Sequence, residues 1–506
     1  YKGEFYLRTM QQLLQKRAMQ SPNLEALVGG EKRYSFQQYN ERVNQLAHYL
    51  LHSGVQRGDR IGILCKNNHP FPSVMMASLK IGAVCIPLNH QLTVYELETI
   101  VKEAKLKVLV IDEEFSEVLL KVDAVKEIPY VIETTKEGFG SFELELQKQP
   151  MTEPNVEVHE EDDAIYLFTS GTTGQAKACV IGHKNLHHYF DEIAGQREIP
   201  AGERFLSVHP LFHMSGVLSI LNCIYHGVTM IFLADSNPTL IWDKIEEEKI
   251  TTMLAFPAVY SYMLDELNKK ERNISTFKVA QSGGTKVPET LIQKYMEKGI
   301  YMVQGYGSTE GWVVTSWHPM MGKEKMSSVG KALKNVEVKI VHPETGHELT
   351  TNEVGEIHVR SPYMFKGYWN NEKATKKVIK DNWFNMGDAG MIDDDGFLHI
   401  MGRYKDVIIR GGDNVYPDQV EDVIHEMHGV LEVAVVGVPD GFWGEIPRAY
   451  IVKDGETILT EESIIQYCKE KLASYKIPEV VFVEELPKNA LGKVLKRELR
   501  ENVLVK

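Results

Sequence analysis

Short apolar runs alternate with amphipathic helical periods through the first two thirds of this chain, and this alternation limits its fold most strongly. The apolar runs, each the length of one strand, are Ile61–Cys65, Val84–Leu88, Val108–Ile111, Ile165–Phe168, Met230–Leu233 and Met253–Phe256. Helical periods between them begin with capping boxes, as at Ser35 with Gln38 and at Thr93 with Glu96. The alternation predicts an α/β fold of stacked, mostly parallel sheets with helices on their faces.

The pattern changes near residue 328, where short alternating strands with Gly, Asn and Asp turns begin. These strands are Val336–Val341, Gly355–Arg360 and Gly396–Ile400. They predict a β-rich subdomain over about 328–402. Further along lie two strands and a helix, at Ala434–Val438, Arg448–Val452 and Glu461–Leu472. We therefore expect a large N-terminal domain over 1–402 and a small, mobile α+β domain over 403–506, joined by a hinge.

The composition limits which partners the protein is expected to bind and which compartment it is expected to occupy. Lys and Arg number 56 against 70 Asp and Glu, so the net charge is −14. Such a surface opposes non-specific binding to nucleic acid and anionic membranes. The five cysteines are scattered without a CxxC pair, which indicates a reducing compartment. No apolar run approaches the ~18 residues of a membrane span, and the first residues lack a signal-peptide layout. We expect a cytoplasmic protein without an integral membrane segment.

The segment Phe168–Lys177 has the composition of a phosphate-binding loop. It follows an apolar strand, and its closely spaced glycines let backbone amides turn toward a phosphate, while hydroxyls and Lys177 add donors and charge. The candidate residues are Thr169, Ser170, Gly171, Thr172, Thr173, Gly174 and Lys177. The segment is not a Walker A loop, because no Gly-Lys-Ser/Thr ends it. The alternative is an ordinary surface turn.

A second segment, Gln304–Glu310, also follows an apolar strand. Its small residues permit close backbone approach, and Tyr306 can stack on a base. Glu310 can hold a divalent cation, which beside nucleotide phosphates is most often Mg²⁺. The alternative for Glu310 is a carboxylate at a helix N-terminus.

Two later segments carry further candidates. Trp383–Asp388 ends in a carboxylate suited to ribose hydroxyls, although a turn aspartate is the alternative. Leu486–Lys493 holds a lysine in a loop that Pro and Gly restrain, which favours an aimed side chain over a solvated charge.

In order and spacing, these segments resemble the adenylate-forming enzymes, which include acyl-CoA synthetases, non-ribosomal adenylation domains and firefly-type luciferases. The matching stretches are Thr169–Ala178, Tyr306–Glu310, Trp383–Asp388, Gly402–Pro417 and Gly492–Lys493. The resemblance covers essentially the whole chain. The departures from the family's pattern are Gln175, Ala176, Ala178 and Met386.

The resemblance implies a ligase that uses ATP, Mg²⁺ and coenzyme A. A carboxylate attacks the α-phosphorus of ATP to give an acyl-adenylate and pyrophosphate, and a thiol then displaces AMP. By this resemblance Lys493 contacts the carboxylate and the α-phosphate, and Glu310 with Thr169 holds Mg²⁺. The nucleotide site is then completed by Gly283, Gly284, Tyr306, Gly307, Thr309, Asp388 and Arg403. Lys405 takes the hinge position, and a rotation there brings Gly411 and Gly412 toward a thiol tunnel.

The sequence defines the carboxylic acid substrate less narrowly than the nucleotide site. The segment Pro210–Gly216 resembles a stretch of acyl- and aryl-CoA ligases in which the histidine, here His213, lies near the carboxylate or the pocket mouth. Outside that resemblance a core histidine is the alternative. The residues that correspond to the family's pocket are Ala280, Gln281, Ser282, Gly305 and Trp312–Val314. They are mainly apolar or small, so we expect an apolar fatty or aryl acid, and Trp312 favours a short or planar one.

The thiol acceptor is expected to come from outside the chain, because no carrier-protein segment follows Lys506. Free CoA is the simplest acceptor, and a stand-alone enzyme that loads a separate carrier protein is the alternative. Assembly as a homodimer stays open.

Overall fold

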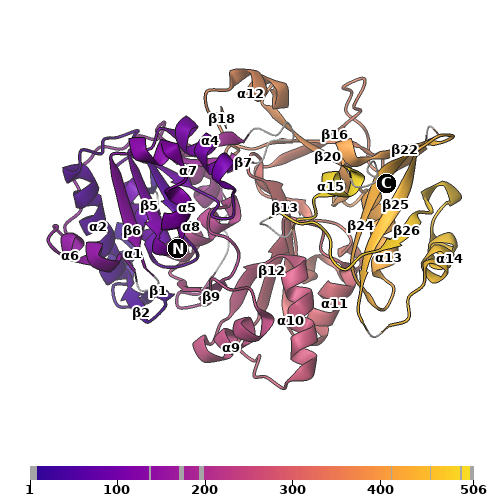
Figure 1. Cartoon of the computed structure of the whole chain (residues 1–506), viewed down its shortest axis with the longest axis horizontal. Helices are drawn as coiled ribbons and strands as arrows, with labels where there is room; N and C mark the ends of the chain where they lie inside the picture. The colour runs from indigo at the N-terminus through magenta and orange to yellow at the C-terminus, as the bar shows by residue number, and fades with distance from the viewer. Residues whose placement is uncertain are drawn as a thin grey trace.

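The computed structural model describes residues 8–135, 138–169, 176–192, 199–411, 413–455, 457–489 and 493–501. Figure 1 shows the N-terminal sheet and its helices on the left, a second sheet with α9, α10 and α11 in the lower middle, and the C-terminal part on the right.

The N-terminal sheet has the strand order β18-β8-β7-β4-β3-β5-β6. Its strands are β3 (Arg60–Leu64), β4 (Val84–Pro87), β5 (Val108–Asp112), β6 (Tyr130–Thr134), β7 (Asp163–Thr169), β8 (Lys177–Gly182) and β18 (Gly367–Tyr368). The run from β7 to β6 is parallel, whereas β8 and β18 are antiparallel to their neighbours. The short β18 therefore pairs residues 367–368, which come much later in the chain, with the N-terminal sheet.

The central sheet has the order β15-β14-β13-β12-β11-β9-β10-β1-β2. Its strands are β1 (Glu25–Gly29), β2 (Lys32–Ser35), β9 (Arg204–Ser207), β10 (Thr229–Phe232), β11 (Thr252–Ala255), β12 (Val279–Gly283), β13 (Tyr301–Ser308), β14 (Trp312–Trp317) and β15 (Lys331–Ala332). The strands from β1 to β13 are parallel, and only the two ends of the sheet are antiparallel.

Two antiparallel-rich sheets follow. The β-rich sheet contains β16 (Glu337–Val341), β17 (Gly355–Arg360), β19 (Ile379–Lys380), β20 (Trp383–Ile392) and β21 (Leu398–Arg403). The C-terminal sheet contains β22 (Ile408–Arg410), β23 (Asp413–Val415), β24 (Val430–Asp440), β25 (Gly444–Lys453) and β26 (Glu479–Phe482). The C-terminal sheet buries its own apolar core, which includes Ile408, Val435 and Ile464. A domain boundary near Gly402 stays a prediction, which this separate core supports.

Helices cover the faces of the sheets. In the first half of the chain they are α1 (Leu13–Gln20), α2 (Phe36–His52), α3 (Pro70–Lys80), α4 (Val94–Ala104), α5 (Ser116–Leu119), α6 (Glu143–Gln147), α7 (His183–Glu192), α8 (Met214–His226) and α9 (Pro238–Glu248). The later ones are α10 (Pro257–Lys269), α11 (Glu289–Glu297), α12 (Glu372–Val378), α13 (Pro417–His425), α14 (Glu461–Lys471) and α15 (Lys496–Glu501). Within the described ranges, none is both long and apolar enough to cross a membrane.

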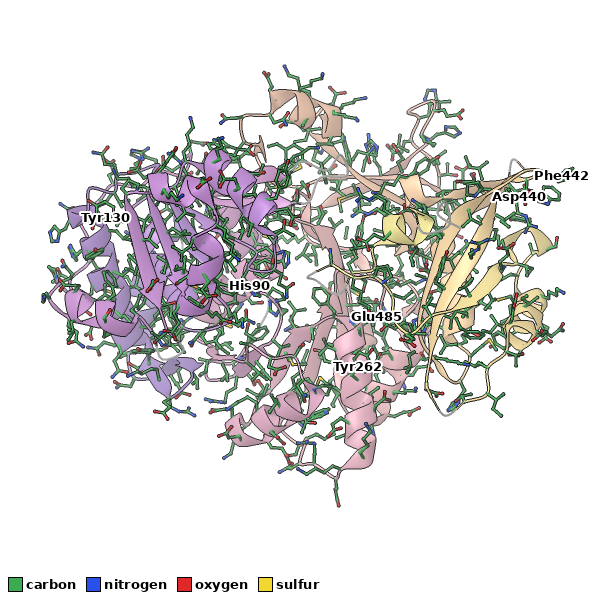
Figure 2. All side chains as sticks on the ribbon, viewed as in Figure 1. His90, Tyr130, Tyr262, Asp440, Phe442 and Glu485 are labelled. Atoms are coloured by element: carbon green, nitrogen blue, oxygen red, sulfur yellow. The ribbon has the colours of Figure 1, made fainter. Side chains whose placement is uncertain are left out.

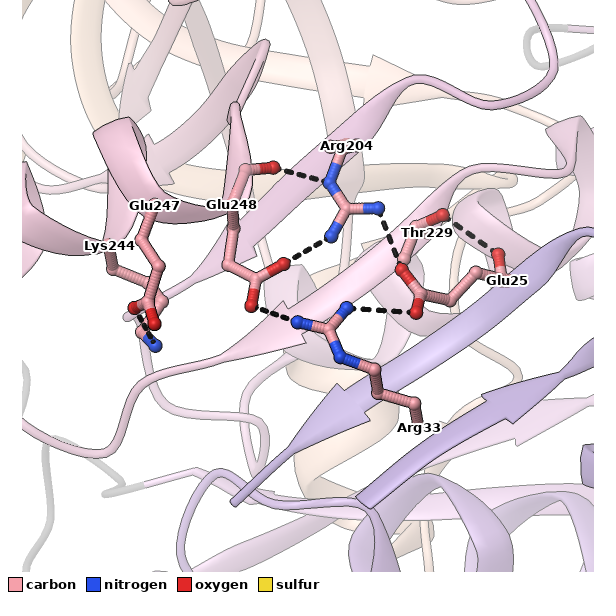
Figure 3. Close-up of polar contacts among 7 residues, drawn as sticks. All are labelled: Glu25, Arg33, Arg204, Thr229, Lys244, Glu247 and Glu248. Atoms are coloured by element: carbon pink, nitrogen blue, oxygen red, sulfur yellow. Dashed lines mark hydrogen bonds and ion pairs between the residues drawn. The ribbon is translucent and has the colours of Figure 1, made fainter. Parts of the chain in front are cut away.

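A charge network links the β1–β2 hairpin to β9 and α9 (Figure 3). Arg33 and Arg204 each bridge the carboxylates of Glu25 and Glu248. Glu248, the last residue of α9, is only 6% exposed, so its charge depends on these partners. The network therefore joins β1, β2, β9 and α9 at one point.

The sequence expectations for the elements are largely confirmed. Every predicted apolar run forms a strand, and both predicted capping boxes form, at Ser35 with Gln38 and at Thr93 with Glu96. One expectation is wrong: the strand predicted before the second segment does not end at Val303. Instead, β13 continues through Tyr306 to Ser308, because its antiparallel partner β14 extends the ladder that far.

Candidate active site

The predicted phosphate-binding segment begins where β7 ends and finishes where β8 begins. Thr169 is the last residue of β7 and pairs in register with Lys177, the first residue of β8. The Thr169 hydroxyl donates to the Lys177 carbonyl over 3.4 Å. Both side chains are half-buried. The candidates between them, Ser170, Gly171, Thr172, Thr173 and Gly174, lie outside the described residues, as does Gly412.

Glu310 lies in the turn between β13 and β14, not at a helix N-terminus, so the alternative interpretation of this carboxylate is wrong. Its carbonyl accepts from the Phe365 amide over 2.9 Å, and its Oε1 accepts from the Tyr368 hydroxyl over 2.9 Å. Thr309 occupies the same turn. Gly307 is required nearby, because a Cβ there would lie 1.7 Å from the Trp312 carbonyl oxygen.

Cys179 links these two parts of the site. Burial raises the pKa of the Cys179 thiol well above its usual range, and the Glu310 carboxylate raises it further. The Thr169 hydroxyl and the Glu310 carboxylate both lie near enough to this thiol to shift its pKa. Glu310, from the central sheet, therefore lies beside Thr169, from the N-terminal sheet.

A single half-buried carboxylate suits Mg²⁺ that arrives with nucleotide phosphates. Among the described residues no group of three or more His, Cys, Asp and Glu side chains could hold a metal alone. Mg²⁺ is usually bound by one or two carboxylates, with phosphate oxygens and water as the other ligands. Glu310, with the adjacent Thr169, fits that requirement.

Tyr306, Asp388 and Arg403 form a second cluster. The Tyr306 hydroxyl donates to Asp388 Oδ2 over 2.7 Å, and Arg403 Nε lies 2.9 Å from Asp388 Oδ1. Asp388 and Arg403 are paired in register on β20 and β21. Burial raises the pKa of Asp388, and Arg403 opposes that effect. Asp388 is thus a buried strand residue and not a turn aspartate.

The glycines predicted to approach adenine border this cluster. Gly283 ends β12 opposite Gly305 of β13, and a Cβ at Gly283 would lie 2.6 Å from the Gly305 carbonyl oxygen. Gly284 has a φ of +79°, which favours glycine. Close backbone packing at Gly283 and the positive φ of Gly284 therefore require glycine at both positions.

The C-terminal part brings Lys493 to the same place. Lys493 is exposed, yet desolvation and then Arg403 lower the pKa of its ammonium group, while Asp388 opposes the shift. Gly411 is placed elsewhere: its amide donates to the Trp443 carbonyl over 2.8 Å. Trp443 follows Phe442, which Figure 2 shows at the outer end of the C-terminal part. Lys493 is therefore within electrostatic reach of Asp388 and Arg403, while the Gly411 amide is bonded to Trp443.

His213 and Trp312, the candidates for the acid-binding site, each lie against aromatic rings. His213 caps the start of α8; burial lowers its pKa to about 3, so it is neutral, and its Nε2 has no hydrogen-bond partner in the described parts of the chain. Trp312 is 1% exposed with a φ of +60°, and its ring contacts Tyr189 and Tyr363. The other candidates for the acid site lie on the neighbouring strands β12, β13 and β14. The half-buried ones are Gln281, Gly305 and Val313, and the buried ones include Ala280 and Ser282.

Sequence reasoning missed Tyr368 and Cys179. Neither belongs to a motif that the chain's spacing singles out, and only the pairing of β18 with β8 brings them to Glu310. Only for Cys179 did the sequence offer a signal. It lies two residues after Lys177, and residues so spaced on a strand share one face.

Comparison with known proteins decides the family. The sequence pattern described as AMP-binding enzyme matches residues 14–369, and the pattern described as AMP-binding enzyme C-terminal domain matches residues 419–493. This chain belongs to the AMP-binding enzyme family. The putative acyl-CoA ligase YdaB of Bacillus subtilis (strain 168) is 44% identical, with 98% of this chain and 100% of that protein covered.

Other members of the AMP-binding enzyme family are also similar. Long-chain-fatty-acid–CoA ligase FadD13 of Mycobacterium tuberculosis (strain ATCC 25618 / H37Rv) is 34% identical, with 97% of each chain covered. The solved structure of the anthranilate CoA ligase AuaEII in complex with anthranoyl-AMP has a TM-score of 0.92 and 25% identity, with 99% of this chain and 98% of that chain covered. The chain is an AMP-forming acid–CoA ligase, and ligases of this family use ATP, Mg²⁺ and CoA.

Proposed function

We propose that this ligase activates an apolar fatty or aryl carboxylic acid, and that the arrangement described above is the one that forms the acyl-adenylate. The observation that carries the proposal is the cluster of Tyr306, Asp388 and Arg403, whose two charged members act on the Lys493 ammonium group. Lys493 is the lysine of the C-terminal part that the family resemblance assigns to the first step.

In the first half-reaction an oxygen of the acid forms a bond to the α-phosphorus, and the bond from that phosphorus to pyrophosphate breaks. Two anions must be brought together, so positioning and charge neutralisation supply most of the catalysis. Lys493 lies between the acid and the α-phosphate, and Asp388 with Arg403 orients the ribose. Thr169 and Lys177 bind phosphate oxygens. Glu310 with Thr169 would hold Mg²⁺, which would neutralise charge on those oxygens.

In the second half-reaction the thiol sulfur bonds to the carbonyl carbon, the thiol loses its proton, and the bond to AMP breaks. In the structure the Gly411 amide donates to the Trp443 carbonyl. We infer that residues 403–506 rotate about Lys405, which withdraws Lys493 and brings Gly411 and Gly412 to the thiol. Lys405 lies in a short 3-10 turn after β21. Lys405→Pro should spare adenylate formation and suppress thioester formation, and equal loss of both would exclude the hinge.

The aromatic surroundings of His213 and Trp312 support the assignment of the acid. His213 is neutral, so it provides no cation for a second carboxylate, and Trp312 with Tyr189 and Tyr363 forms an aromatic wall. A wall of rings favours planar or short acids. Aryl and aliphatic acids both satisfy this description.

The function is tested by ATP-dependent pyrophosphate release over fatty, aryl and amino acids, each with and without CoA. We expect release with an apolar acid and a thioester only when CoA is present. Release without any CoA thioester would instead indicate a separate carrier protein. Homodimer assembly and a cytoplasmic location stay predictions.

A further inference from the structure

One strand pairing places an unassigned phenol at the metal carboxylate. In the antiparallel pair of β18 and β8, Tyr368 lies opposite Cys179. Lys177 is two residues before Cys179 on β8, so the side chains of Lys177, Cys179 and Tyr368 share one face of the N-terminal sheet. Thr169, which pairs with Lys177, joins the same face.

Tyr368 contacts both charged groups of the phosphate region. Its hydroxyl donates to Glu310 Oε1 over 2.9 Å, and Lys177 Nζ lies 5.2 Å from the centre of its ring. An ammonium group is attracted to an aromatic face at that separation. A carboxylate can accept about four hydrogen bonds or metal contacts, so one donated bond leaves Glu310 free to bind a cation.

The backbone of Tyr368 is held firmly. Its amide donates to Thr375 Oγ1 over 2.9 Å, and the flanking Trp369 and Lys366 amides donate to the Ala178 and Val180 carbonyls, each over 2.9 Å. A side chain on so restrained a backbone can orient a metal ligand. Glu310, in contrast, comes from a turn of the central sheet.

We propose that Tyr368 is a positioning residue for the Mg²⁺–nucleotide complex: its hydroxyl orients the Glu310 carboxylate, and its ring supports Lys177. This inference rests on the proposed metal role of Glu310 and adds a residue to it. Partners of metal ligands typically change metal affinity by about 10- to 100-fold when they are removed. The hydroxyl and the ring should therefore have separable effects.

The test measures the affinity of the whole enzyme for α,β-methylene-ATP by calorimetry, once with Mg²⁺ and once in EDTA. The ratio of the two affinities reports how much the metal strengthens nucleotide binding. Tyr368→Phe keeps the ring and removes the hydroxyl, so the ratio should fall about 10-fold while the affinity in EDTA is unchanged. Tyr368→Leu removes the ring as well, and should also weaken binding in EDTA a few-fold.

Tyr166→Phe is the matched control. It removes a phenol hydroxyl that donates to a carboxylate, Asp163, over 2.7 Å on the same sheet but away from Glu310. Its ratio should equal that of the unmodified enzyme. Melting temperatures should confirm that all variants are folded.

The possible outcomes distinguish the role of Tyr368 from the metal role of Glu310. An unchanged ratio in Tyr368→Phe, with a collapsed ratio in Glu310→Gln, overturns the role of Tyr368 alone. An unchanged ratio in Glu310→Gln overturns the metal role of Glu310 and the inference with it. If the affinity ratio falls equally in Tyr166→Phe and Tyr368→Phe, the effect comes from general packing, and the inference is overturned.

Discussion

Lys286, in the loop after β12, forms an ion pair with Asp422 on α13 and so joins the central sheet to the C-terminal part. Tyr262 on α10 makes a second such contact, a 3.1 Å hydrogen bond to Glu432 on β24. Figure 2 shows Tyr262 on the side of α10 that faces the C-terminal part. These contacts belong to the arrangement in which Lys493 is within electrostatic reach of Asp388 and Arg403.

Lys286→Ala should weaken that arrangement. The pair is partly exposed, and such pairs contribute about 0–1 kcal/mol, so adenylate formation should slow by up to about fivefold. Thioester formation from preformed acyl-adenylate should be unchanged or faster. Single-turnover measurement of each half-reaction checks this. Lys471→Ala, which removes the Lys471–Glu426 pair within the C-terminal part, should change neither rate. Slowing of both half-reactions by Lys286→Ala would refute the interpretation.

Lys493→Ala should lower adenylate formation by about 10³-fold, the usual effect of removing one group that stabilises transition-state charge. Its ammonium group is the one that the C-terminal part brings to Asp388 and Arg403. ATP binding should stay mostly intact. Pyrophosphate release, with calorimetric ATP affinity, measures the two effects. The exposed Lys469 provides the control, because Lys469→Ala should leave both unchanged. A normal rate in Lys493→Ala would remove the lysine from the mechanism.

Trp312→Gly should relieve the positive φ of this residue and open the aromatic wall. We expect kcat/KM to shift by at least about tenfold toward longer acids. The melting temperature should fall, because removal of a buried tryptophan leaves a cavity. Rates over a series of acids of increasing length test the shift. An unchanged order of preference would place Trp312 outside the acyl site.

Glu248→Gln should destabilise the protein by about 3–5 kcal/mol, because it leaves Arg33 and Arg204 without one of their two carboxylates. Glu247→Gln is the neighbouring control. Glu247 pairs with Lys244 over 2.6 Å and is 65% exposed, so its change should be within about 0.5 kcal/mol. Urea unfolding of the two variants measures the difference. Equal effects would show that the network of Figure 3 adds no stability beyond a surface pair.

Buried histidines should make the protein less stable in acid. Burial lowers the pKa of His183 to about 4, and its Nδ1 accepts a hydrogen bond from the Met10 amide over 3.2 Å. The unfolded chain therefore binds more protons than the folded one between about pH 6.5 and pH 4. Stability is full above pH 6.5 and falls as the pH drops, by about 2 kcal/mol at pH 5 for this one group.

His183→Gln should flatten that dependence, as seen in urea midpoints at pH 7.5, 6.5 and 5.5. The variant should be less stable at pH 7.5 but lose less on acidification. His347→Gln, at an exposed position, should keep the original slope. A slope unchanged by His183→Gln would show that His183 is not a source of the acid sensitivity.

The sequence predicted the elements well and the site in part. Apolar runs such as Val108–Ile111 became strands, because a buried parallel strand has no polar face to alternate with. The capping boxes at Ser35 and Thr93 formed because they involve only neighbours in the chain. The position of Glu310 was harder to predict. Its turn depends on how far β13 pairs with β14, which no local signal reveals.

What the sequence determined by itself is the set of residue types with the right chemistry, in an order that matches one family. Local patterns decide strands, caps and loops because the forces involved act over a few residues. The tertiary structure alone decided which groups meet: Tyr368 reaches Glu310 through a two-residue strand, and Lys493 acts on the charge of Asp388 from the loop before α15. Such contacts depend on strand register and on how separate sheets pack, and these are set by burial across the whole molecule.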